Sequence, residues 1–473
     1  MAGGKTHRWV DTTGCFIKRE GKMRFLAFAY GFAVLLVFSH GMACAGQARA
    51  NLGLDARLRF EYQDGFNAKY YGDNPPRGAG EDRFLLERLR AGFDFMPADK
   101  VRFVLWMQDS GAADLAMPDN AFYNASLQGE NNPYRDRCEL WDAYAELMDV
   151  SGLPLNIRAG RQRLFFGDKR VFGPGEWGNS GRWIWDALRI SFRSGKGSAD
   201  FYYGRTMVHD PHTFSVGHRH FYESFGFYSC LPLTERMGGI AVEPFSMTKR
   251  DDHPNYRGED GRTGPLDSWY AGFRAYKYHP GGLQWDVTYV RQFGNYGPDD
   301  IDAYGFHILL GYRLPDFFMS PGISLEYSYG SGDSDPADNE HGAFDGAFGA
   351  RDRMYGRMNL FKWRNIKDAQ VNLEFKPCRG LSVVAGFHKF RLASDKDGWS
   401  LNPGVYRDVT GLSGNDVGDE LDIVCRFDAT NSTCLQAGFG HFRPGGFTEK
   451  VASGRQADWV FVQWEYRFAA QLL

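Results

Sequence analysis

A strict two-residue alternation constrains the fold of this chain more than any other feature, and residues 54–62 show it most clearly. This segment, LDARLRFEY, has an apolar residue at every second position and a charged residue at each position between. Successive side chains of a β-strand point to opposite faces, so the segment predicts a strand with one apolar and one charged face. Similar alternation recurs at residues 101–108, 187–193, 323–330, 369–375, 420–427 and 459–468.

The connections between these segments sort into two kinds that alternate along the chain. Eight short turns alternate with nine mostly longer polar segments, which are centred near residues 73, 124, 174, 213, 256, 297, 342, 405 and 449. This pattern gives 18 strands, with both termini on the short-turn side. The sequence therefore predicts an all-β fold: a transmembrane antiparallel up-and-down barrel of about 18 strands, with short periplasmic turns and long extracellular loops. We expect strands of roughly 10 residues.

A large soluble β-sandwich or propeller is the alternative, because alternation alone also describes a sheet with one wet face. The aromatic residues near strand ends, the aromatic-rich last strand and the lack of a blade-length repeat favour the barrel. No segment after the N-terminal region approaches 18 consecutive apolar residues, and the mean hydropathy is −0.45. These observations exclude a helical membrane bundle.

The N-terminal region has the order of a secretory signal peptide. Basic residues at 18–24 precede an apolar stretch at 25–38 and a small-residue segment that ends at Ala45. We predict a signal peptide at residues 1–45 and a barrel domain at residues 46–473, with a second candidate cleavage site after Ala50. Removal of residues 1–45 takes away six basic and two acidic residues, which moves the net charge from −3 to about −7.

Several short motifs cluster in residues 158–192. They are Gly-Arg-Gln at 160–162, Gly-Asp-Lys-Arg at 167–170, Trp-Gly-Asn at 177–179 and Trp-Asp-Ala-Leu-Arg at 185–189. Together with residues 359–377 and 438–447, these motifs resemble the alginate-export outer-membrane proteins. The resemblance implies an 18-stranded barrel in the outer membrane of a Gram-negative bacterium, with a basic pore that passes an acidic polysaccharide. It does not fix the substrate.

The charged strand faces are expected to line the lumen if the apolar faces contact lipid. A row of guanidinium groups suits a polyuronate, because each carboxylate can accept a bidentate pair of hydrogen bonds. The alternative is that these arginines pair with Asp and Glu across strands and only fill a polar interior. The predicted pore-lining or anion-contacting residues are Arg57, Arg59, Arg88, Arg90, Arg102, Arg158, Arg161, Arg170, Arg182, Arg189, Arg193 and Arg467.

The loop at residues 165–185 combines these cations with aromatic side chains. We expect Trp177, Trp183 and Trp185 to contact a sugar, because aromatic faces beside cations suit a sugar acid. The alternative is a loop that folds inward, braces the wall and narrows the pore.

Metal sites, cofactors and catalysis are not expected. Residues 208–220 contain His209, Asp210, His212, His218 and His220, which are types that bind transition metals, but no familiar ligand spacing is present. The acidic segment at 332–345 lacks a complete EF-hand pattern, and no convincing Ser-His pair suggests an enzyme.

The leading hypothesis is an outer-membrane channel that passes an anionic, alginate-like polysaccharide out of the periplasm. A general or anion-preferring porin for small solutes is the alternative, since it shares every strand-level feature. The expected partners are the polysaccharide or small anions, outer-membrane lipid and periplasmic export components, with no nucleic acid.

Overall fold

The computed structural model describes residues 48–124, 129–175, 177–181, 183–212, 214, 219–233, 239–278, 281–352, 354–401 and 405–472. The expected signal peptide, together with Arg182 and His218, lies outside these residues. Within them, 18 strands form one closed antiparallel barrel, which confirms the predicted fold class. Among the described residues, no helix combines the length and the apolar character of a membrane-spanning segment.

The barrel strands are β1 (Arg49–Asp64), β2 (Glu81–Ala98), β3 (Val101–Ala113), β6 (Asp136–Leu147), β7 (Leu155–Arg163), β8 (Ile184–Ser194), β9 (Gly197–Val208), β10 (Arg219–Pro232), β11 (Ala241–Arg257), β12 (Thr263–Lys277), β13 (Gly282–Tyr296), β14 (Asp299–Arg313), β15 (Gly322–Gly330), β17 (Ile366–Cys378), β18 (Leu381–Arg391), β21 (Asp416–Asp428), β22 (Thr433–Pro444) and β23 (Ala457–Gln471). The connections contain η1 (Asp119–Phe122), β4 (Tyr123–Asn124), β5 (Gly129–Glu130), η2 (Val150–Gly152), β16 (Glu340–His341), β19 (Trp399–Ser400), β20 (Val405–Tyr406) and α2 (Gly446–Val451).

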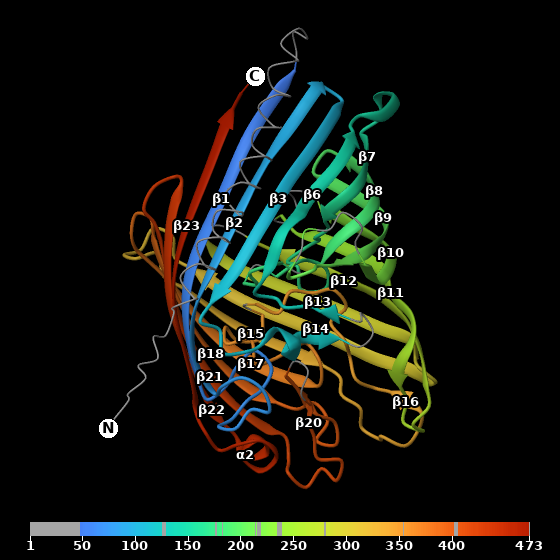
Figure 1. Cartoon of the computed structure of the whole chain (residues 1–473), viewed down its shortest axis with the longest axis vertical. Helices are drawn as coiled ribbons and strands as arrows, with labels where there is room; N and C mark the ends of the chain where they lie inside the picture. The colour runs from blue at the N-terminus through green and yellow to red at the C-terminus, as the bar shows by residue number, and fades with distance from the viewer. Residues whose placement is uncertain are drawn as a thin grey trace, which may run out of the picture.

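The first and last strands close the barrel by pairing with each other. Figure 1 shows the red β23 beside the blue β1. The antiparallel register places Arg57 of β1 opposite Glu465 of β23, and Asp55 opposite Arg467. Closure leaves no free sheet edge in the barrel, as a strand-built membrane span requires.

The two faces of β1 differ as the alternation predicts. Leu58 and Phe60 are 44% and 43% exposed on the outer face, whereas Arg57 and Arg59 are only 3% and 1% exposed on the inner face. An outward apolar band is what a lipid bilayer demands of a barrel. The charged side chains therefore lie inside, where other parts of the protein cover them.

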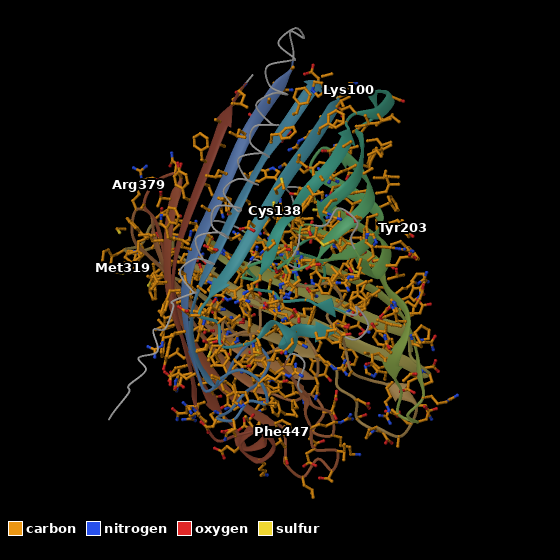
Figure 2. The ribbon with its side chains drawn as sticks, in the orientation of Figure 1. Lys100, Cys138, Tyr203, Met319, Arg379 and Phe447 are labelled. Carbon is orange, nitrogen blue, oxygen red and sulfur yellow. The ribbon has the colours of Figure 1, made fainter. Side chains whose placement is uncertain are left out.

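Short turns and long loops lie at opposite ends of the molecule. Figure 2 shows Lys100, in the turn between β2 and β3, at one end and Phe447 of α2 at the other. Two of the nine connections expected to be mostly longer are short, since residues 297–298 alone join β13 to β14, and residues 258–262 join β11 to β12. Gly297 adopts a φ of 62° and is followed by Pro298, so the chain turns tightly there. Most strands are longer than expected, with 18 residues in β2, although β7 and β15 have 9 residues each.

Candidate functional site

Two long loops pack against each other inside the barrel. They are the β7–β8 loop, residues 164–183, and the β15–β17 loop, residues 331–365, and we call them the plug loops. The carbonyl oxygen of Phe348 accepts a hydrogen bond from the amide of Gly173 at 3.1 Å, and the Phe348 amide donates to Val171 at 3.1 Å. Their apolar side chains join one large buried cluster with side chains of the barrel wall. The lumen is therefore partly filled by its own loops.

A glycine makes the close approach of the plug loops possible. A β-carbon at Gly349 would overlap the carbonyl oxygen of Arg170. Beside this contact, the amide of Ala350 donates to the carbonyl of Lys169 at 2.9 Å. The Gly-Asp-Lys-Arg motif and residue 349 thus form a close contact between two loops that are far apart in sequence.

Arg57 and Arg59 of the wall hold the β7–β8 plug loop. Arg57 donates from Nη2 to the carbonyl of Gly178 at 2.9 Å and to Oδ1 of Asn179 at 3.0 Å. Arg59 donates from Nη1 to the carbonyl of Trp177 at 2.7 Å, and its guanidinium lies 3.7 Å from the centre of that indole ring. These contacts fit the inward-folded alternative for the loop.

Asn179 fixes the same loop to three other segments. Its buried Nδ2 donates to the backbone carbonyls of Glu87, Gly111 and Tyr134 at 3.0, 3.0 and 2.9 Å. An amide NH₂ carries two hydrogens, so these three contacts share them in part. The asparagine of the Trp-Gly-Asn motif therefore anchors the plug to β2, β3 and the β3–β6 loop.

The other predicted wall arginines are held mostly by acidic partners. Arg90 is an exception, because it donates to Oε1 of Gln108 at 2.7 Å and lies 3.6 Å from the Trp141 ring centre. Ion pairs join Arg88 to Asp55, Arg102 to Asp94, Arg158 to Glu146, Arg161 to Glu139 and Asp186, Arg189 and Arg193 to Asp200, and Arg467 to Asp55. These ion pairs fit the alternative in which the arginines pair with Asp and Glu and only fill a polar interior.

Arg170 joins a plug loop to the barrel wall. Its Nη2 lies 3.3 Å from Nε2 of His307 on β14, and its Nη1 lies 3.4 Å from Oγ of Ser328 on β15. Its Nε also pairs with Asp168 of the same motif at 3.3 Å. Arg170 is buried and lines one of the cavities that the plug loops leave open.

The larger of these cavities has a volume of about 630 Å³. Both plug loops contribute to it, together with the β1–β2 and β3–β6 loops. Aromatic rings of Trp177, Trp183 and Trp459 form part of its wall. Its titratable lining groups include Arg59, Glu61, Lys69, His209, Arg351, Asp352 and Arg357.

A smaller cavity of about 390 Å³ shares Trp183, His209 and Arg351 with the larger one. Among the described residues that line it, cations outnumber acids, and Asp345 is the single carboxylate. That carboxylate pairs with Lys249. The cationic side chains are Arg170, Lys249, Arg351, Lys362 and Arg364.

The three tryptophans expected to contact sugar differ in their placement. Trp177 and Trp183 line the cavities. Trp185 is instead the second residue of β8 and is fully buried, with its ring centre 4.8 Å from that of Phe348. The sugar contact expected for Trp185 is therefore corrected, because the plug covers its ring.

Sequence reasoning missed several cations that line the cavities. Arg351, Arg357, Lys362 and Arg364 belong to the β15–β17 plug loop, and Lys69 belongs to the β1–β2 loop. The available signal was the density of basic residues in 351–367, which is followed directly by the strand segment 369–375. Which loop enters the lumen depends on tertiary contacts that the alternation does not encode.

The charge of Lys69, which lines the larger cavity, should depend on pH near neutrality. Burial, with help from the nearby Arg77, lowers the pKa of Lys69 to about 8. Its ammonium donates to the carbonyl of Ala121 and lies 4.5 Å from the Phe122 ring centre. Below pH 8 the side chain is charged and attracts anions, and above pH 8 this attraction is lost.

We expect the affinity for a small anion added as a probe to fall about fivefold from pH 7 to pH 9, as loss of roughly 1 kcal/mol of Coulomb attraction would produce. Titration of the purified protein with a small carboxylate at both pH values measures this change. Lys69→Arg should be insensitive to pH, because arginine stays protonated. An equal decrease in the arginine variant would assign the effect to another group.

Comparisons with known proteins agree with this architecture. A family model described as alginate export matches residues 48–463. No curated protein matches the chain in sequence.

Solved structures show the same fold at low sequence identity. Acinetobacter baumannii OccAB2 is 11% identical with a TM-score of 0.57, and the match covers 89% of this chain and 98% of that chain. Pseudomonas aeruginosa OccK3 (OpdO) is 12% identical with a TM-score of 0.54, and the match covers 89% of this chain and 96% of that chain. Pseudomonas aeruginosa OccD3 (OpdP) is 11% identical with a TM-score of 0.56, and the match covers 92% of this chain and 94% of that chain.

Proposed function

This chain belongs to the alginate export family of Gram-negative outer-membrane β-barrels, and from this premise we propose that its lumen conducts anionic saccharides out of the periplasm. The protein is an outer-membrane channel. The proposal concerns what passes through it: an acidic, alginate-like polysaccharide. No step in this transport requires bond making or bond breaking by the protein.

The lining of the two cavities carries the proposal. The smaller cavity combines five cationic side chains with one carboxylate, and the larger one adds the rings of Trp177 and Trp459. Cations bind the carboxylate of a sugar acid through charge-assisted hydrogen bonds. Aromatic rings offer flat apolar faces beside these cations. Together they suit a charged sugar better than a neutral one.

The wall arginines are proposed to act on the saccharide indirectly, and not as its main direct contacts. Their acidic partners neutralise much of their charge, so they contribute a polar, weakly basic surface. Partial neutralisation also supports transport, since a contact in a channel must be weak enough to release its ligand. The plug-loop cations then provide the stronger selection.

A porin for small anions is the second candidate, and the volume of the cavities favours it. Spaces of about 630 and 390 Å³ are typical of small-ligand sites, whereas a polymer needs a continuous path. Export of a polymer would therefore require the plug loops to separate. Small anions would need less movement.

Reversal potentials in planar bilayers test the anionic part of the proposal. With a KCl gradient across a bilayer that holds the purified protein, we expect a reversal potential whose sign shows that chloride permeates more readily than potassium. Cation selectivity would contradict the proposed cargo while leaving the channel itself in place.

A further inference from the structure

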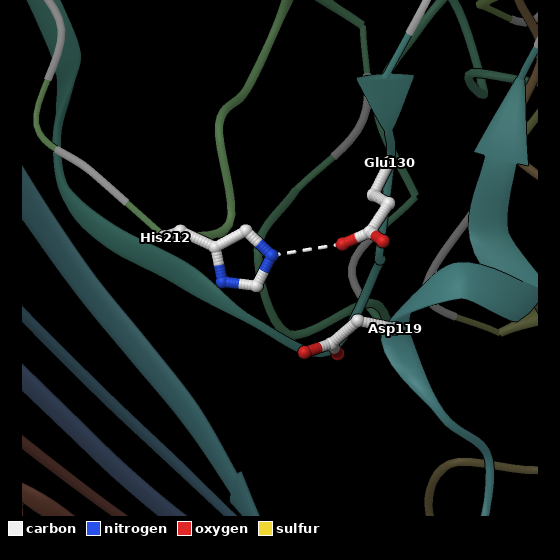
Figure 3. A group of neighbouring side chains, drawn as sticks. All are labelled: Asp119, Glu130 and His212. Atoms are coloured by element: carbon white, nitrogen blue, oxygen red, sulfur yellow. Dashed lines mark hydrogen bonds and ion pairs between the residues drawn. The ribbon is translucent and has the colours of Figure 1, made fainter.

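Three potential metal ligands from two loops, β3–β6 and β9–β10, lie close together. They are Asp119 of η1, Glu130 of β5 and His212 of the β9–β10 loop, and Figure 3 shows the imidazole and the Glu130 carboxylate facing each other. His212 Nε2 lies 2.8 Å from Oε2 of Glu130. One ligand atom from each of the three side chains lies within 4.8 Å of the others.

The types of these side chains indicate which class of ion would fit. Calcium and magnesium prefer shells made entirely of oxygen, whereas an imidazole nitrogen with two carboxylates suits zinc and related transition metals. Bonds from Zn²⁺ to nitrogen or oxygen are roughly 2.0–2.2 Å long, so ligand atoms lie about 3.5 Å apart in a tetrahedral site. Small side-chain rotations would bring the three ligand atoms to this spacing.

Asp119 is held in place by neighbours on its own loop. Arg135 donates to its Oδ2 at 3.0 Å, and Asn132 donates to its Oδ1 at 2.7 Å. Carboxylates that bind metals are commonly oriented by such outer hydrogen bonds, and each oxygen retains a further lone pair. With two carboxylates and one guanidinium, the group keeps the net negative charge that attracts a cation.

Space beside the group allows water to complete the coordination. A cavity of about 470 Å³ is lined by Asp119, Arg135 and His212. A tetrahedral site with three protein ligands keeps its fourth position for water or another small ligand.

We propose that Asp119, Glu130 and His212 form a transition-metal site of the Zn²⁺ type that fastens the β3–β6 loop to the β9–β10 loop. The β3–β6 loop also carries Phe122 and Tyr134, which line the larger cavity. An ion bound here would hold one wall of that cavity at a fixed distance from the barrel. This inference stands apart from the nature of the cargo, because none of its three ligands lines either of the two cationic cavities.

Zinc titration of the untagged, full-length protein in detergent tests the site. After treatment with a chelator, isothermal titration calorimetry with ZnCl₂ should show one more bound ion in the wild type than in His212→Ala. Glu130→Gln should weaken that same event by at least about tenfold, in line with loss of a ligand or its orienting group. Heat-modifiable migration on gels verifies that each variant retains its barrel.

The matched control is His253→Ala. His253 also pairs with a carboxylate, Asp251, at 2.6 Å and is exposed, but it belongs to no group of three ligands among the described residues. This variant should bind zinc like the wild type. The proposal is overturned if the wild type binds no more zinc than His212→Ala, or if His253→Ala loses the same ion.

Discussion

Replacement of Asn179 by Ala is expected to undock the β7–β8 plug loop and to raise the single-channel conductance severalfold. The buried side-chain amide makes four hydrogen-bond contacts: its Nδ2 faces three backbone carbonyls, and its Oδ1 accepts from Arg57. Because the two amide hydrogens are shared among three carbonyls, the side chain makes about three full hydrogen bonds. Their loss, at about 1 kcal/mol each, amounts to about 3 kcal/mol, or roughly a hundredfold in the docking equilibrium. The barrel strands should stay intact, because the anchored loop lies inside a closed sheet.

Conductance in planar bilayers measures this effect directly. Asn295→Ala provides the matched control, because Asn295 is an asparagine whose side-chain amide donates to Asp300 of the same hairpin at 3.0 Å. Its conductance should equal that of the wild type. A wild-type conductance for Asn179→Ala would mean that the plug does not limit the current.

Replacement of both Arg351 and Arg364 by Gln is expected to abolish most of the anion preference. Both residues line the smaller cavity, where Asp345 would then face three remaining cations, Arg170, Lys249 and Lys362. Loss of two charge-assisted contacts, at about 1.5 kcal/mol each, corresponds to roughly a hundredfold weaker binding of an oligouronate.

The double variant is best compared with Arg262→Gln. Arg262 lies on an exposed hairpin and pairs with Asp260, so its loss changes the net charge without touching the lumen. Reversal potential and oligouronate block should both resemble the wild type in this control. If the double variant and the control behave equally, the selectivity arises from other residues. The paired wall arginines would then be the next candidates.

The barrel could be predicted from the sequence because the pattern that specifies it involves only residues close together in the chain. Alternation assigns Leu58 and Phe60 to one face and Arg57 to the other, and turn residues then give the strand number. The same local rule misjudged the segment around residue 297, where Gly297 and Pro298 make a tight turn and the polar residues after them continue into β14.

The candidate site could be predicted only in part. The sequence showed that Arg59 faces inward, but it could not show that Trp177 covers its guanidinium. Arg351 and Arg364 reach the lumen because Gly349 lets one loop approach the carbonyl of Arg170, which lies 179 positions earlier in the chain. A period-two pattern holds no information about such contacts between distant loops.

Current block by saccharides of matched length tests whether the lumen selects anionic sugars. We expect an oligouronate to block the wild-type channel in a concentration-dependent manner, and a neutral oligosaccharide of the same number of residues to block it far less. The difference should shrink in the Arg351→Gln, Arg364→Gln variant. Equal block by the charged and neutral saccharides in the wild type would contradict a lumen that selects anionic sugars.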